Sequence, residues 1–135
     1  MPKEKITSAE AFIATSNITN ALGRMVKRQS AAPGYAPASA GTDVPGGIIY
    51  VPGKSRGAGV TQFTATIATG DDVHIATAGV VQVKLGANLA AGANVTANAS
   101  GVAVAPTSGD YVWGQLMEGG SSGDYVPMMI NVFKI

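Results

Sequence analysis

Short apolar runs, each closed by glycine or proline, dominate the chain from residue 47 onward. Residues 60–69 (VTQFTATIAT) alternate between polar and apolar side chains, which is the period of a half-buried strand. The other runs that fit strands are 47–51, 72–76, 80–85, 92–97, 101–105, 111–117 and 125–133. About eight short strands at roughly 8–12-residue spacing predict a mainly β fold, a single compact β-barrel or β-sandwich.

Glycine marks the expected turns between these runs. The pattern Gly, polar or small residues, then Val recurs from Gly70, Gly92 and Gly123, and each copy is expected to turn the chain into a strand. The expected turns between neighbouring strands lie at 77–79, 98–101 and 118–123. The spacing of the pattern is irregular, so it indicates repeated hairpins and not a solenoid.

The front of the chain has a different character. Thr7 and Glu10 fit a helix capping box, and apolar residues follow at helical spacing, but the polar residues between them are poor helix formers. A short helix and an extended arm are therefore both open for residues 1–27. Residues 29–46 are rich in Pro, Gly, Ala and Ser, which is typical of a loop. We expect an N-terminal arm and loop over 1–46 and a β-rich domain over 47–135.

Composition points to an assembly. Only 13% of the 135 residues are charged, about half the usual share, so the surface suits a chain that is covered by partners. The net charge of +1 argues against nucleic acid as a partner. Residues 1–56 contain seven Lys or Arg and three acidic residues, whereas residues 57–135 contain two Lys or Arg and five acidic residues. A basic front half can dock on an acidic surface, and a solvated scatter of charges is the alternative.

Chemical motifs are scarce. Cysteine is absent, which excludes disulfides. Gly53-Lys54-Ser55 lacks the spacing and the following helix of a P-loop, and Pro52 removes a backbone donor. His74 shares a strand face with Asp72 but has no further partner, so a structural or surface histidine is favoured over a ligand. We expect no catalytic residue, metal or cofactor, and neither a signal peptide nor a transmembrane helix is predicted.

Aromatic residues cluster late in the chain. Trp113, with Tyr111, Tyr125 and Phe133, could stack on sugar or on single-stranded nucleic acid. Such residues more often form the core and the cross-strand pairs of a sheet, and that interpretation is favoured.

Over residues 70–132 the order of elements resembles a known family. A Gly-Val strand is followed by the hairpin LAAGANVTANASGVAV, then by VWGQL and by GDYVPMMI. This order is similar to that of tailed-bacteriophage capsid decoration proteins, also called cement or head-stabilising proteins. The resemblance implies a structural protein and not an enzyme, made in the host cytoplasm and held on the outer capsid surface of the virion. Its implied partners are the major capsid protein, which it bridges, and its own copies in a homotrimer or dimer, without nucleic acid or membrane.

Within this picture, five front residues are the expected partner contacts. Arg24, Lys27 and Arg28 would meet an acidic capsid face, and Phe12 and Ile13 would supply apolar contacts. The alternative function is a β-rich carbohydrate-binding or head-fibre module for host attachment.

Overall fold

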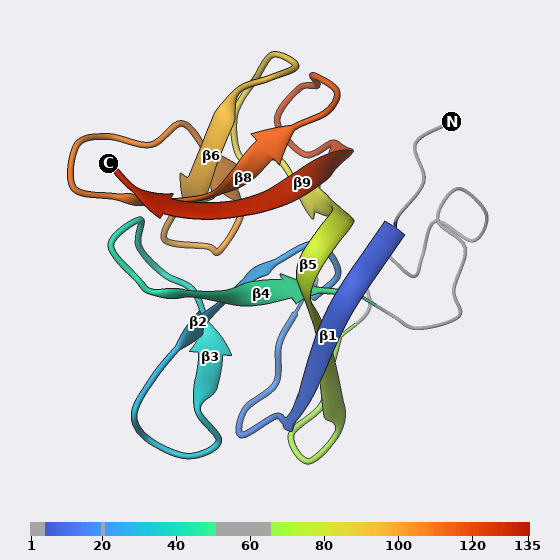
Figure 1. The fold of residues 1–135 in the computed structure, drawn as a ribbon. Coiled ribbons are helices and arrows are strands. Elements are labelled where there is room, and N and C mark those ends of the chain that lie inside the picture. Colours follow the sequence, from blue (N-terminus) through green and yellow to red (C-terminus); the bar gives the residue numbers. More distant parts are fainter. Residues whose placement is uncertain (1–4, 20, 51–65) are drawn as a thin grey trace.

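The computed structural model describes residues 5–19, 21–50 and 66–135. These residues form a mainly β fold, as the sequence predicts. The described residues contain no helix, and so no helix long and apolar enough to cross a membrane. The strands are β1 (Lys5–Ile13), β2 (Met25–Arg28), β3 (Tyr35–Pro37), β4 (Pro45–Ile49), β5 (Asp72–Lys84), β6 (Asn94–Ala97), β7 (Ala103–Val104), β8 (Tyr111–Leu116) and β9 (Tyr125–Lys134). All paired strands are antiparallel, in a sheet that curls into a half-barrel (Figure 1).

Strand β5 connects the parts of this sheet, because it pairs with β1, β4 and β9. Ile75 pairs with Glu10 of β1 and with Ile49 of β4, so β1 and β4 lie on opposite edges of β5. Val80 pairs with both β1 and β9, so β9 follows β4 along the same edge. Two groups of strands therefore leave one edge of β5: the N-terminal wing (β4, β2 and β3) and the C-terminal wing (β9, β8, β6 and β7). Figure 1 shows both wings running from β5, with β1 on the other side.

Two clusters of buried apolar side chains form the hydrophobic cores that stabilise the packing of these strands. The first core draws on both wings and on β5: Met25, Ala38, Ile48, Ala76, Val81, Val83, Leu85, Val95, Ala97, Ala103, Trp113, Leu116, Val126 and Met128. The second core joins the front segment to β4 and β5: Phe12, Ala14, Ile18, Ala21, Leu22, Val26, Ile49, Val73 and Ile75. Six of these nine side chains precede residue 47, and the other three belong to β4 and β5, so the front segment is packed into the fold.

The front segment is therefore extended and paired. Residues 5–13 form β1, which confirms the extended alternative over the helix. The segment expected as loop, 29–46, contains β3, and the expected domain boundary at residue 46 falls inside β4. The pairing of β1 with β5 joins residues 59 to 75 positions apart in sequence, and local propensity does not indicate such a pairing.

The glycine pattern corresponds to real turns. Four glycines with φ of 84–94° lie just before strands: Gly70, Gly92, Gly109 and Gly123. Each occupies the third position of a turn closed by a backbone hydrogen bond of 3.0–3.2 Å, which is a type II geometry that requires positive φ. Three of the four carry the pattern predicted from the sequence, and Gly109 is a further copy.

Two other turn predictions have different outcomes. The hairpin turn at 98–101 is confirmed, because β6 pairs with β7 and Asn98 Oδ1 accepts the backbone N–H of Ser100 at 2.8 Å. The turn at 77–79 is wrong: β5 runs unbroken through it, and Gly79, at φ 99°, lies where β1 shifts register. The expected strand at 60–69 and the Gly53-Lys54-Ser55 motif lie largely or wholly outside the described residues.

Candidate functional site

Three of the expected contact residues lie on or beside β2, but the fold separates them. Arg24 precedes the strand and Arg28 ends it, roughly 13 Å apart at about 3.3 Å per residue. Lys27 lies 4.0 Å from the carboxylate of Asp43, which also accepts the backbone N–H of Ser39 at 2.8 Å. The charge of Lys27 is thus partly balanced, whereas Arg24 and Arg28 form no ion pair among the described residues.

Arg24 lies in a polar recess with a volume of about 540 Å³. Its Nη1 donates to the backbone oxygen of Thr19 at 3.0 Å, while its Nε is buried without a partner in the described part of the chain. Burial lowers the pKa of the Arg24 guanidinium. Lys84 lines the same recess, and Asn98 and Ser122 add further polar groups. Two cations and neutral hydrogen-bonding groups in one recess suit an anionic ligand, such as a carboxylate.

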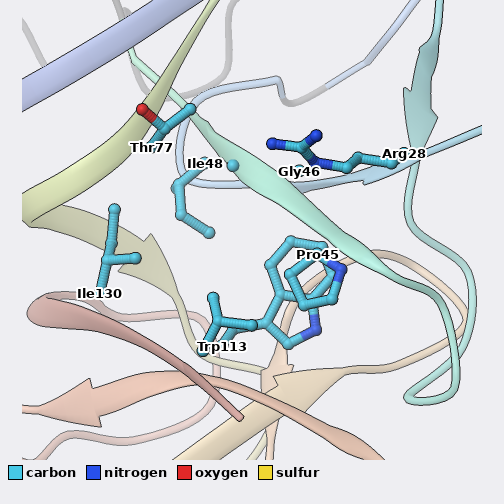
Figure 2. Close-up of a pocket in the computed structure, with 9 residues that line it drawn as sticks. Arg28, Pro45, Gly46, Ile48, Thr77, Trp113 and Ile130 are labelled. Atoms are coloured by element: carbon cyan, nitrogen blue, oxygen red, sulfur yellow. The ribbon is translucent and has the colours of Figure 1, made fainter.

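Arg28 lies at a second hollow, which we call the fork because it opens where β4 and β9 leave the same edge of β5. The fork has a volume of about 210 Å³. Figure 2 shows Thr77 and Ile130 on one side of it, Trp113 and Pro45 on the other, and Arg28 above. The lining is mostly apolar, so the fork differs in chemistry from the polar recess.

The two apolar residues expected to meet a partner have different surroundings. Phe12 is 8% exposed and stacks on Tyr35 with 5.2 Å between ring centroids, so its side chain belongs to the second core. Ile13 is 50% exposed and lies at the end of β1. Only Ile13 of this pair presents its side chain to the surface.

Large apolar side chains are exposed at and just after the end of β9. The sequence pattern predicts a strand here but does not indicate that these side chains are exposed. Met129, Val132, Phe133 and Ile135 are each between 39% and 51% exposed. The signal that could have found them is the missing alternation over MMINVF, where apolar residues occupy both faces of one strand. A cluster of exposed large apolar side chains is typical of a surface that binds another protein.

Trp113 and His74 are both explained by packing. Trp113 is 1% exposed in the first core, which confirms the core interpretation over a stacking platform, and its Nε1 has no partner among the described residues. His74 is partly exposed and meets Tyr50 edge-on at 6.3 Å, while Val73 and Ile75 on the other face are buried. The described residues contain no group of three or more His, Asp or Glu placed to hold a metal ion.

Exposed apolar side chains and a polar recess with two cations, carried on a β-sheet scaffold, are features of proteins that bind other proteins. A family model described as "Structural cement protein (E217 gp24/Pam3 gp6)" matches residues 1–131. The chain thus belongs to this family of phage structural proteins, which supports a capsid decoration role. No curated protein sequence matches the chain.

One solved structure is similar to the chain over nearly its whole length: the crystal structure of the head fibre gp8.5 N base in bacteriophage phi29. The TM-score is 0.61 at 21% sequence identity, with 92% of this chain and 93% of that chain covered. At this identity the likeness shows a shared fold.

Proposed function

We propose that this protein binds the outer surface of the assembled phage head and stabilises it by bridging neighbouring major capsid subunits. The observation that carries the proposal is the family match over residues 1–131. A protein that binds the assembled lattice and not the free subunits shifts the equilibrium toward the shell by mass action, so no chemistry is required.

The charges of the front segment support contact with an acidic capsid face. Arg24 and Arg28 carry charges that no described carboxylate balances, and Ile13 adds an exposed apolar contact. Lys27 contributes less, because Asp43 lies beside it. The buried side chain of Phe12 stacks on Tyr35 of β3 and so stabilises this surface from the core side.

We also propose that the protein acts as a homotrimer, with a dimer as the alternative. Several weak contacts from one oligomer add through their effective concentration, so each contact can be modest. The low charge of the chain suits a molecule with much of its surface covered by sister copies and capsid.

Sedimentation of the protein with purified heads that lack it tests the proposal. We expect binding to heads but not to free capsid subunits, and a higher melting temperature of the decorated heads. Arg28→Glu and Arg24→Gln should each weaken binding by about tenfold, while the matched control Lys5→Glu, an exposed lysine on β1, should change it by less than about threefold. Equal binding to free subunits, or heads that melt alike with and without the protein, would contradict it.

The second candidate function is a head-fibre module for host attachment. The similarity of the fold to the head fibre base of phi29 favours it. A sugar-binding version that uses Trp113 is disfavoured, because that side chain is buried. Binding of the purified protein to host cells or to a glycan array, without binding to heads, would favour this second function.

A further inference from the structure

The fork is bounded by strand edges without a partner among the described residues. On one edge of β5, β4 pairs with Ile75 and Ala76 and β9 pairs from Val80 onward, so the residues between them have neither neighbour on that edge. Beyond Met129, β9 pairs only with β8, on its other edge. On the edge opposite β8, residues 130–134 of β9 have no strand partner in the part of the chain that the structure describes, and Ile130 and Val132 of this stretch line the fork.

This edge has one of the features that usually protect strand edges, a register irregularity opposite β8 between Ile130 and Phe133, but it has no charge or proline before its end. Natural edges carry charges, prolines or bulges that turn them away from other strands. The first charge on this stretch is Lys134, at the end of β9, and the residues before it are apolar apart from Asn131. An open apolar edge recruits an extended chain, which adds a strand through backbone hydrogen bonds.

The hollow beside the edge has the size of one side chain. Its volume of about 210 Å³ lies below the roughly 300–1,000 Å³ of ligand pockets, but exceeds the ~150 Å³ of a cavity that binds benzene. Ile48, Trp113, Ile130 and Val132 supply apolar walls, and Val132 is 51% exposed. An aromatic or large aliphatic side chain from an added strand would bury this surface.

We infer that the fork binds an extended segment of a capsid subunit, which pairs with the free edge of β9 and inserts one large apolar side chain between Trp113 and Ile130. This inference rests on the proposed function, and it names the recognition chemistry. The segment carries an acidic residue beside the inserted side chain, because Arg28 lies at the mouth of the fork without a described carboxylate partner.

Charge favours a capsid subunit over a second copy of this chain. Two copies that pair their β9 edges about a two-fold axis bring Arg28 and Lys134 of each copy toward those of the other. Like charges in such an arrangement oppose association, and β9 contains no acidic residue to offset them. An acidic segment of another protein meets both cations favourably.

A pocket-filling variant tests the inference. Val132→Trp puts a large side chain into the fork, and Met117→Trp is its matched control, since Met117 is 50% exposed and lies outside the fork. We expect Val132→Trp to weaken binding to purified heads at least about tenfold with an unchanged melting temperature, and Met117→Trp to bind as the parent protein does. Parent-like binding by a folded Val132→Trp variant would overturn the inference.

Photo-crosslinking gives an answer that does not depend on the folding of that variant. Replacement of Phe133 by p-benzoylphenylalanine keeps an aromatic ring at a half-exposed position of the same edge. Crosslinking to a capsid subunit, at an extended segment with an acidic residue beside an apolar one, is the expected result. Crosslinks only between copies of this chain, or only within one copy, would overturn the inference. If the parent protein does not bind heads at all, the proposed function fails and the inference fails with it.

Discussion

Truncation of Leu22 to alanine tests whether the front segment is part of the folded core. Leu22 is 1% exposed and packs in the second core, which also contains Ile49 of β4 and Ile75 of β5. A buried Leu→Ala change removes favourable transfer energy and leaves a cavity, and typically costs about 2–5 kcal/mol. Because a domain of this size is stable by about 5–15 kcal/mol, the loss is a large fraction of the total.

The assay is urea unfolding followed by circular dichroism and by fluorescence of the single tryptophan. A loss of about 3 kcal/mol at a slope of about 2 kcal/mol per M lowers the midpoint by about 1.5 M, and lowers the melting temperature by about 12 °C. Ile13→Ala is the matched control in the same segment: its side chain is half exposed, so its removal leaves no cavity and should cost less than about 1 kcal/mol.

Equal stability of the Leu22→Ala and Ile13→Ala variants would refute the reasoning. It would mean that residues 1–46 form a detachable arm and that the core lies wholly in the later strands. By the same reasoning, deletion of residues 1–28 should unfold the protein, because it removes β1 and β2 together with most of the second core.

Two further predictions concern the contacts of β1. Gly79→Ala should release β1 from β5, because a Cβ at Gly79 would lie 2.8 Å from the backbone nitrogen of Thr7 and against the backbone oxygen of Lys5. Hydrogen exchange should then show that the β1 amides exchange faster than in the parent protein. Unchanged protection of these amides would contradict the pairing of β1 with β5. The hydrogen bond from the Tyr35 hydroxyl to the Glu10 carboxylate raises the pKa of Tyr35, so this bond stabilises the fold below about pH 10 and its contribution is lost as pH rises through the raised pKa. Ultraviolet titration should show the pKa of Tyr35 falling in Glu10→Gln; an unaltered titration in that variant would exclude the bond as the cause.

The later strands could be predicted because their signals are local. The glycines at 70, 92 and 123 each permit a positive φ before a strand, and the sequence pattern identifies those positions directly. Gly79 has the same conformational freedom but serves a register shift inside a strand, so the same signal gave a wrong turn. Sequence alone does not distinguish a glycine that ends a strand from one that bends it.

The front segment and the fork could not be predicted, for a different reason. β1 pairs with β5, 59 to 75 residues away, and its polar side chains face solvent, so its composition resembles that of an unpaired arm. The fork depends on which edge of β5 receives β4 and β9, and a strand pattern carries no information on strand order. Arg24 and Arg28 are close in sequence, but the extended β2 places them at different hollows.

The central claim is that the protein decorates the phage head and bridges its subunits, and electron cryomicroscopy of heads with and without the bound protein tests it most directly. The account predicts difference density on the outer surface that spans boundaries between neighbouring major capsid subunits across the whole shell. Such density should have an extended capsid segment seated against β9. Density confined to a few fibre positions, on the inner surface, or on single subunits without a bridge would contradict the account.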